Sequence, residues 1–231
     1  MKEKILRIIG RWLLAILALS VAIVVCLRWI APPTSAFMAE ARLARLLDRG
    51  KKGPVRYHWI DLKSISPYLP LAVVAAEDQK FPFHWGFDLG SIGKAIESYD
   101  RGHHLRGAST ISQQVAKNLF LWPGRSFVRK GLEAYFTVLL ELFWPKKRIL
   151  EVYVNIAEFG DGVFGAQAAA TVLRGKSPSR LSRDDAALLA AVLPNPIELK
   201  VAHPSGYVAA RRRWIIEQTG RLGGTGYLKD L

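Results

Sequence analysis

Residues 107–121 read GASTISQQVAKNLFL, a run in which polar residues fill the spacings that a core helix gives to apolar ones. Two hydroxyl residues, Ser109 and Thr110, open the run. Four polar side chains follow in two pairs spaced four apart: Gln113 with Lys117, and Gln114 with Asn118. Side chains four apart lie on the same side of a helix, where a core helix would carry an apolar stripe. The pattern therefore predicts a helix whose polar side chains form a binding site.

Two further strings place a glutamate in an unusual setting. EDQKFPFHWGFD begins with Glu77, which ends an apolar stretch, and RKGLE ends with Glu133. A carboxylate at the edge of an apolar helix is partly desolvated, which raises its pKa toward the range useful for a general base. The alternatives are a solvated helix-end carboxylate at Glu77 and an ordinary helical ion pair between Arg129 and Glu133.

The chain is strongly basic, with a formal net charge of +14 over 231 residues. Such a charge favours anionic partners, namely phosphate-bearing substrates, acidic lipid headgroups or nucleic acid. Four cations lie among the strings described above: Lys117, Arg125, Arg129 and Lys130. Taken singly, each fits ordinary surface charge better than a binding role.

The cysteine and histidine content argues against a metal centre or a disulfide scaffold. The single cysteine, Cys26, excludes an intramolecular disulfide and a multi-cysteine zinc site. The five histidines include no pair spaced as HxxxH, so we expect no metal ligands.

An uncharged run near the N-terminus predicts a membrane anchor. Residues 12–30 reach the roughly 20 residues that a spanning helix needs, if Arg28 extends toward the lipid headgroups. The alternative is a signal peptide cleaved after Ala36, although the apolar core of a signal peptide is usually about 7–15 residues long. The flanking basic residues indicate only weakly that the N-terminus lies inside.

The rest of the chain reads as mostly helical, without a βαβ pattern. Capping residues, prolines and glycines place the predicted helices at residues 37–49, 67–78, 88–100, 127–144, 146–159, 165–174, 183–192 and 206–219. Ser66 and Ser126 are the expected N-caps of two of them, and residues 55–59 alternate as a short extended segment. GDGVFG at 160–165 fits G-x-G-x-x-G, but it follows a helix, so we expect no dinucleotide site. The predicted fold class is mainly α, with two lobes around a cleft.

Four strings together resemble the motifs of the peptidoglycan glycosyltransferases, glycosyltransferase family 51. They are EDQKFPFHWGFD, GASTISQQVAKNLFL, RKGLEAYF and RILEVYVNIAEFG, and they occur in the family's order within about residues 71–170. The resemblance implies a lysozyme-like glycosyltransferase domain, at residues 37–231, on the periplasmic face of the inner membrane. Residues 1–11 would then be cytoplasmic and residues 12–30 would span the membrane once. The chain resembles the monofunctional enzymes of this family.

The resemblance also implies an activity and a role for each site residue. Members polymerise lipid II into glycan strands with inversion at the donor anomeric carbon and release of undecaprenyl pyrophosphate. Glu77 matches the general base, and Glu133 matches the second glutamate, which assists departure of the pyrophosphate. Lys117 and Arg125 match cations that contact the pyrophosphate. The other expected substrate-binding residues are Ser109, Thr110, Gln113, Gln114, Asn118, Asp78, Arg129 and Lys130. Ala108 and Ser112 depart from the family pattern, which usually has glycine and threonine there.

The expected partners follow from the same resemblance. They are lipid II, the growing strand, the inner membrane and other cell-wall synthesis proteins, with no nucleic acid. No cofactor is expected to be required, and stimulation by Mg²⁺ or Mn²⁺ stays open. The rival functions are a glycan-cleaving enzyme, which would not need the cations at Lys117 and Arg125, and a non-catalytic envelope protein. The glycine-flanked segment 99–108 is expected to move as a lid over the cleft.

Overall fold

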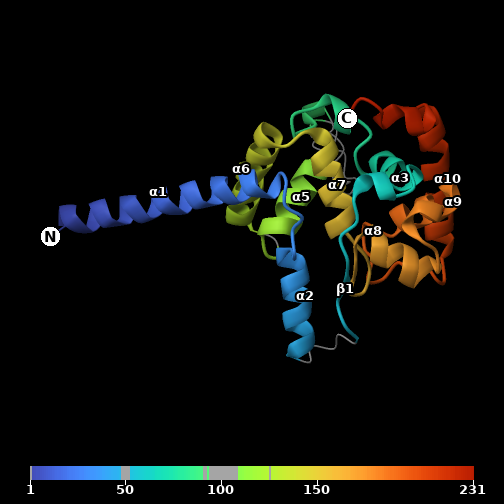
Figure 1. Cartoon of the computed structure of the whole chain (residues 1–231), viewed down its shortest axis with the longest axis horizontal. Helices are drawn as coiled ribbons and strands as arrows, with labels where there is room; N and C mark the ends of the chain where they lie inside the picture. Colours follow the sequence, from blue (N-terminus) through green and yellow to red (C-terminus); the bar gives the residue numbers. More distant parts are fainter. Residues whose placement is uncertain (1, 48–52, 91–92, 94–108, 125) are drawn as a thin grey trace.

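Helices make up most of the chain in the computed structural model, which describes all residues except 1, 48–52, 91–92, 94–108 and 125. Figure 1 shows α1 (Lys2–Leu27) projecting from a helical body. The body contains α2 (Ala36–Leu46), α3 (Tyr68–Glu77), α5 (Ile111–Phe120), α6 (Phe127–Phe143), α7 (Lys146–Ile156), α8 (Gly165–Ala168), α9 (Arg183–Ala191) and α10 (Gly206–Arg221). Short 3-10 helices lie at Leu62–Ser64, Phe81–Phe83, Pro178–Arg180 and Gly224–Leu228. The mainly α fold predicted from the sequence is confirmed.

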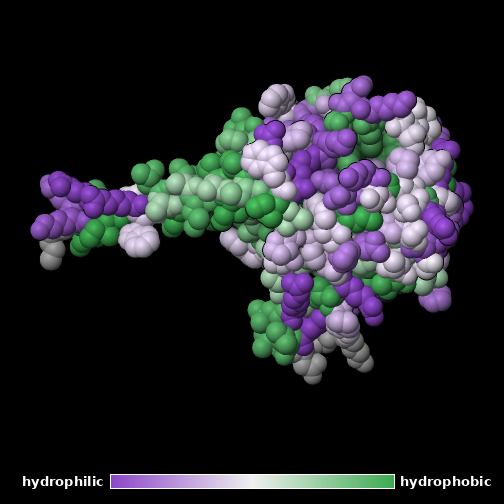
Figure 2. All heavy atoms as spheres, in the orientation of Figure 1, coloured by the Kyte–Doolittle hydropathy of each residue, from purple (hydrophilic) through white to green (hydrophobic). Residues whose placement is uncertain are grey.

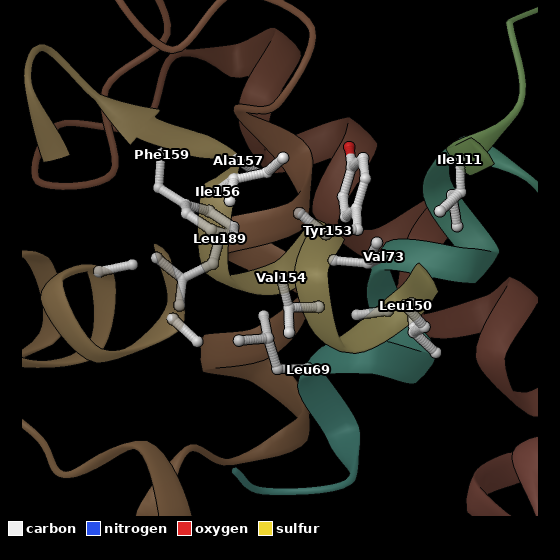
Figure 3. Packing of buried hydrophobic residues seen from close by; sticks show 14 of the residues in the cluster. Leu69, Val73, Ile111, Leu150, Tyr153, Val154, Ile156, Ala157, Phe159 and Leu189 are labelled. Atoms are coloured by element: carbon white, nitrogen blue, oxygen red, sulfur yellow. The ribbon is translucent and has the colours of Figure 1, made fainter. Parts of the chain in front are cut away.

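Helix α7 is the central element, and its apolar side chains join the two lobes. Residues 149, 150 and 152–156 of α7 are all buried. One lobe contains α5 and α6, and α7 packs against α5 of this lobe. The other lobe contains α3, α9 and α10, and α7 contacts its α3. Figure 3 shows Leu150 and Val154 of α7 close to Leu69 and Val73 of α3. The core therefore runs through the middle of the molecule, and the C-terminal end of α7 borders a cleft.

A small three-stranded sheet contains the segment that fits a dinucleotide motif. Its order is β1 (Arg56–Tyr57), β3 (Val163–Phe164) and β2 (Glu158–Gly160), with β1–β3 parallel and β2–β3 antiparallel. Gly162 and Gly165 both have positive φ, of 73° and 81°, and a Cβ on Gly165 would collide with the carbonyl group of Asn155. Gly162 therefore serves the tight turn between β2 and β3, and Gly165 allows the close approach of the start of α8 to Asn155.

Several predicted helix ends are confirmed, and others are wrong. Ser126 caps α6, and its Oγ accepts a hydrogen bond from Arg129 N at 3.1 Å. Ser66 is not an N-cap, because α3 begins at Tyr68 and the Ser66 hydroxyl donates instead to Leu181 O at 2.7 Å. The helix predicted to reach Phe159 ends at Ile156, because the chain turns there into β2.

The other predicted helices are close to those observed, with three exceptions. The helix predicted at 165–174 is α for four residues and then π-helical over Ala169–Leu173. The helix predicted at 37–49 runs as α2 from Ala36 to Leu46, and the helix predicted at 88–100 falls largely outside the described residues.

Helix α1 is docked on the body by hydrogen bonds as well as by apolar contacts. Trp144 Nε1 donates to Val24 O at 2.8 Å, and Arg148 Nη2 donates to the carbonyl oxygens of Leu27 and Ile30 at 3.0 and 2.8 Å. Val24 is fully buried, whereas most of α1 is exposed. Figure 2 shows the exposed part as an apolar band that continues onto the adjacent body and ends in a hydrophilic N-terminal tip. Among the described residues, this is the one helix long and apolar enough to cross a membrane.

A buried carboxylate at the start of α9 supports a stability prediction. Asp185 completes a capping box with Ser182 and contacts Arg174 Nη2 and Lys176 Nζ, each at 2.5 Å. Burial alone would raise the pKa of this carboxyl, but hydrogen bonds from Lys176, Ser182 and Arg174 outweigh burial and hold the pKa well below its usual range. Asp185 therefore stabilises the fold as a carboxylate.

We expect Asp185→Ala to lower the free energy of unfolding by about 3 kcal/mol, since hydrogen bonds to charged groups and a helix cap are lost. Asp184→Ala is the control, because Asp184 is 53% exposed and surface ion pairs contribute at most about 1 kcal/mol. The native pKa is depressed, so the contribution of Asp185 is complete above the ordinary aspartate pKa of 3.8 and is lost as pH falls toward the native value. Unfolding of the detergent-solubilised chain at several pH values measures both effects. Equal losses in the two variants would contradict the assignment.

Candidate active site

Glu77 is the last residue of α3, and its carboxylate lies where three other helices meet. Its Oε2 accepts a hydrogen bond from Gln114 Nε2 of α5 at 3.0 Å, and its Oε1 lies 3.4 Å from Arg211 Nη2 of α10. Tyr153 of α7 in turn donates to Gln114 Oε1 at 3.0 Å. The side chain of Glu77 is only 14% exposed, so the alternative of a solvated helix-end carboxylate is wrong.

The surroundings of Glu77 change its proton affinity. Burial raises the pKa of this carboxyl above the ordinary glutamate value, while Gln114, Arg211 and more weakly Lys117 act in the opposite direction. The net pKa is raised, as expected for a base that must take a proton from a hydroxyl group. The role of Glu77 as a general base stays a prediction, and its buried position and raised pKa are the properties that such a base needs.

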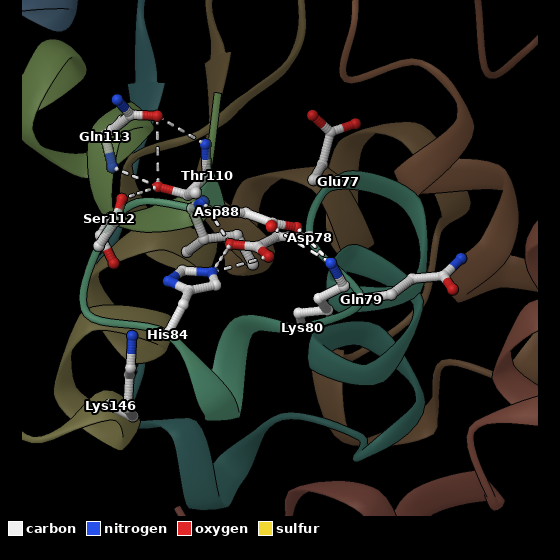
Figure 4. A network of polar contacts seen from close by, with 12 residues as sticks. Glu77, Asp78, Gln79, Lys80, His84, Asp88, Thr110, Ser112, Gln113 and Lys146 are labelled. Atoms are coloured by element: carbon white, nitrogen blue, oxygen red, sulfur yellow. Dashed lines mark hydrogen bonds and ion pairs between the residues drawn. The ribbon is translucent and has the colours of Figure 1, made fainter. Parts of the chain in front are cut away.

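The neighbouring carboxylate, Asp78, holds the start of α5. Its Oδ2 accepts a hydrogen bond from Ile111 N at 3.0 Å, and both of its oxygens contact His84 Nε2, at 2.9 and 3.0 Å. Figure 4 shows this network, with the carboxylate of Glu77 directed away from it. Asp78 is only 7% exposed. Its carboxylate therefore binds groups of the protein itself and is not open to a substrate in this structure.

Two of the predicted binding residues form the N-terminal cap of α5. Thr110 Oγ1 accepts from Gln113 N, and Gln113 Oε1 accepts from Thr110 N at 3.0 Å, which is a capping box. Thr110 Oγ1 also donates to Gly86 O at 2.6 Å. Both side chains are buried, whereas Ser109 is exposed. Thr110 and Gln113 therefore shape the loop and the helix start, which the spacing argument did not predict.

Helix α5 also carries an apolar stripe that the sequence reasoning overlooked. Ile111, Val115, Ala116 and Leu119 are buried at i, i+4, i+5 and i+8 against α6 and α7. Ser112, one of the departures from the family pattern, is fully buried and its hydroxyl donates to Glu141 Oε1 at 2.5 Å. The polar face of α5 is thus narrower than the sequence indicated, and it consists of Gln114, Lys117 and Asn118.

These three side chains line a small cleft between the lobes. The cleft has a volume of about 180 Å³ and is lined by Phe37, Gln114, Lys117, Asn118, Tyr153, Ile156, Ala157, Glu158, Phe164, Leu193, Pro194 and Pro196. Asn118 Oδ1 is buried without a hydrogen-bond partner. Burial lowers the pKa of Lys117, and Glu133 opposes this more than any other nearby charge. The partly desolvated cation suits an anionic group, and the amide oxygen, an acceptor, suits a hydrogen-bond donor such as a hydroxyl group, so the cleft fits a polar ligand that carries both.

Glu133 lies on α6 in a buried ionic cluster. Its Oε2 accepts from Arg129 Nη1 at 2.8 Å and its Oε1 from Lys130 Nζ at 2.5 Å, and the side chain is 3% exposed. The helical ion pair weighed as an alternative is therefore present, but it is buried and includes a second cation. Arg129 is also buried, so it is not ordinary surface charge, whereas Lys130 is half exposed.

Two predictions concern residues that the structure does not describe. Arg125 and the segment 99–108 lie outside the described residues, so the pyrophosphate contact and the lid stay predictions. Conversely, sequence reasoning missed Arg211 and did not single out Tyr153. Tyr153 is within one of the quoted motifs, whereas Arg211 lies in the basic run RRR at 211–213, which resembles a solvated helix face.

Together, the described residues define a class of protein: a mainly helical domain with a buried glutamate, a cationic cleft between two lobes and one N-terminal helix long and apolar enough to cross a membrane. The chain matches the model of the transglycosylase family over residues 44–220. It therefore belongs to the transglycosylase family, whose domain is lysozyme-like.

Three similar proteins share one description. The biosynthetic peptidoglycan transglycosylase of Pseudomonas entomophila strain L48 is 52% identical over 231 residues, covering 100% of this chain and 98% of the relative. Proteins of the same description from Xylella fastidiosa strain M23 and Xanthomonas campestris pv. campestris strain B100 are each 55% identical, covering 91% and 95% of this chain and 86% and 91% of their own lengths. The chain is a peptidoglycan glycosyltransferase of cell-wall biosynthesis.

Proposed function

We propose that this enzyme polymerises lipid II into glycan strands, with inversion at the donor anomeric carbon and release of undecaprenyl pyrophosphate. The observation that carries the proposal is the placement of Glu77: a buried carboxylate of raised pKa, hydrogen-bonded to the same helix that presents Lys117 to the cleft. Glu77, at one end of this arrangement, suits a hydroxyl group that must lose a proton. Lys117, at the other end, suits an anionic group that must leave.

The chemistry of glycosyl transfer gives Glu77 and Lys117 different roles. A sugar hydroxyl becomes an effective nucleophile when a base removes its proton in the transition state, and Glu77 is the base in this proposal. The bond from the anomeric carbon to the pyrophosphate oxygen breaks as the new glycosidic bond forms. The negative charge that develops on the pyrophosphate is stabilised by Lys117, already fixed at the cleft, and by Arg125.

We propose that Glu133 assists the leaving group by holding cations. Its two oxygens each bind one basic side chain, Arg129 and Lys130. It is also the nearby charge that most strongly favours the protonated, cationic form of Lys117. The carboxylate thereby keeps several positive groups in a fixed arrangement near the departing pyrophosphate. In this proposal no cofactor is required, and a divalent metal such as Mg²⁺ or Mn²⁺ acts only as a stimulant.

We further propose a single-pass location in the inner membrane, with residues 12–30 spanning it, residues 1–11 cytoplasmic and the catalytic domain, residues 37–231, periplasmic. The partners are lipid II, the growing strand and other cell-wall synthesis proteins, without nucleic acid. The exposed apolar band of α1 suits lipid, and the end of α1 nearest the body packs on α6 and α7.

Residues 12–30 are therefore expected to remain in the mature protein. Cleavage after Ala36 would remove Val24, Leu27 and Ile30, whose carbonyl oxygens accept hydrogen bonds from Trp144 and Arg148. The buried Trp144 donor would lose its partner, which is unfavourable, and Arg148 would lose two acceptors. N-terminal sequencing of the mature protein tests this, and a sequence that begins at Phe37 would contradict the anchor.

The polymerisation itself is tested with the purified full chain in detergent. Incubation with fluorescent lipid II is expected to give a ladder of glycan polymers together with released polyprenyl pyrophosphate. Incubation with preformed glycan strands is expected to leave them intact. Cleavage of strands without polymer formation would instead indicate the rival, glycan-cleaving function.

A further inference from the structure

A cation on α10 reaches the glutamate that acts as base in the proposed reaction. Arg211 Nη2 lies 3.4 Å from Glu77 Oε1 and 3.3 Å from Ala76 O. The guanidinium carbon lies 6.0 Å from the centroid of the Trp214 ring, within the range of a cation–π contact. The side chain is only 22% exposed. Arg211 is therefore oriented toward α3 rather than toward solvent, although it belongs to a basic run.

The second oxygen of Glu77 is held from the opposite lobe. Gln114 Nε2 donates to Glu77 Oε2, and the Tyr153 hydroxyl donates to Gln114 Oε1, each at 3.0 Å. Because the amide accepts through its oxygen, its nitrogen must point to the carboxylate. Burial raises the pKa of Tyr153 well above its usual value, so the phenol stays protonated and remains a donor. Figure 3 shows Tyr153 anchored within the apolar core.

Few charges face Glu77 from the elements around it. Arg211 contacts it from α10, Lys117 of α5 acts on it at longer range, and Gln114 of α5 is neutral. Tyr153 of α7 reaches Glu77 only through Gln114. Among the described residues, Arg211 is the one cation with an ion-pair contact to Glu77. It thus opposes the effect of burial on the charged form.

We propose that Arg211 is a positioning residue for Glu77: it fixes one carboxylate oxygen while Gln114, held by Tyr153, fixes the other. The inference rests on the proposed role of Glu77 as base. A base acts when it lies within hydrogen-bond reach of the hydroxyl in a set orientation, and two opposed contacts prevent the carboxylate from rotating. The positive charge of Arg211 also keeps the base in its proton-accepting form at lower pH.

The test is the pH profile of kcat/KM for lipid II polymerisation by the full chain in detergent. Arg211→Gln is expected to move the acidic limb upward by about one pH unit, since an opposite charge at this range lowers a carboxyl pKa by roughly one unit or more. Arg211→Lys is expected to keep the acidic limb but to lower kcat. A flexible ammonium is not oriented by the Trp214 ring as a planar guanidinium is, and it cannot be relied on to hold both Ala76 O and Glu77 Oε1 from one fixed position.

Arg212→Gln is the matched control. It removes the same charge from the next residue of α10, where Arg212 forms only a partly exposed ion pair with Asp184 at 3.3 Å. The acidic limb of its pH profile and its polymerisation rate are expected to match those of the wild-type protein. A lower rate for Arg211→Gln with an unmoved limb would mean that Arg211 only supports packing. Equal limb shifts in Arg211→Gln and Arg212→Gln would mean that bulk charge is responsible, and either result overturns the proposal.

The proposal and the function on which it rests fail in different ways. If the wild-type chain makes no polymer, the proposed function fails. If the wild-type chain is active and Glu77→Gln is not, but the limb of Arg211→Gln is unmoved, only the role of Arg211 fails. Should thermal unfolding show that Arg211→Gln does not fold, Arg211→Lys decides the matter, and a wild-type kcat in that variant would overturn the proposal.

Discussion

Replacing Glu77 with glutamine is expected to reduce lipid II polymerisation by about 10²–10⁴-fold, the usual contribution of a general base. Glutamine preserves the size of the side chain and can still accept a hydrogen bond from Gln114, but it cannot take a proton. The variant is therefore expected to fold, with a thermal unfolding transition near that of the wild-type protein. Polymer yield from labelled lipid II and thermal unfolding are the two measurements.

Glu217→Gln is the control for this substitution. Glu217 lies on α10, is 56% exposed and pairs with Arg221, so its loss is expected to leave the rate unchanged. In the wild-type protein the acidic limb of kcat/KM is expected above the ordinary pKa of glutamate, 4.5, because burial raises the pKa of Glu77 and the base must be deprotonated to act. Wild-type turnover by a folded Glu77→Gln protein would remove Glu77 from the mechanism.

Lys117→Ala is expected to lower kcat/KM by about 10²–10³-fold, the loss seen when one fixed group that stabilises developing charge is removed. Lys117 lines the cleft and is partly desolvated, so its charge acts with little screening by water. Lys63→Ala is the control, since Lys63 is 83% exposed and lies in the 3-10 helix Leu62–Ser64. Initial rates at several lipid II concentrations measure the effect. Equal losses in the two variants would mean that only total charge matters.

The sequence predicted the helical framework because local signals decide it. Ser126 caps α6 as expected, and the predicted helices at 183–192 and 206–219 lie within two residues of α9 and α10. The errors occur where contacts distant in sequence prevail. The end of α7 depends on a sheet that joins residue 56 to residue 163, and such a pairing leaves no mark in the local sequence of α7.

The candidate site was predicted only in part, because motifs in the local sequence point to some of its residues and contacts between distant residues bring in the others. The motif order identified Glu77, Gln114, Lys117 and Glu133, whose surroundings the structure describes as buried and charged. Thr110 and Gln113 have polar side chains that serve the backbone of α5, and residue type alone does not separate that role from ligand binding. Arg211 could not be predicted because it lies 134 residues from Glu77, in a run that resembles solvated charge. Only the packing of α10 on α3 brings the two together.

The central claim is that Glu77 drives a direct, inverting transfer from lipid II. The most direct test uses lipid II that carries an isotope label at the anomeric carbon of the donor sugar. Nuclear magnetic resonance of the polymer made by the wild-type chain reports the configuration of each new linkage. Inversion is expected at every linkage, with one polyprenyl pyrophosphate released per bond. Retention of configuration would indicate a covalent intermediate on the enzyme and would contradict a direct transfer.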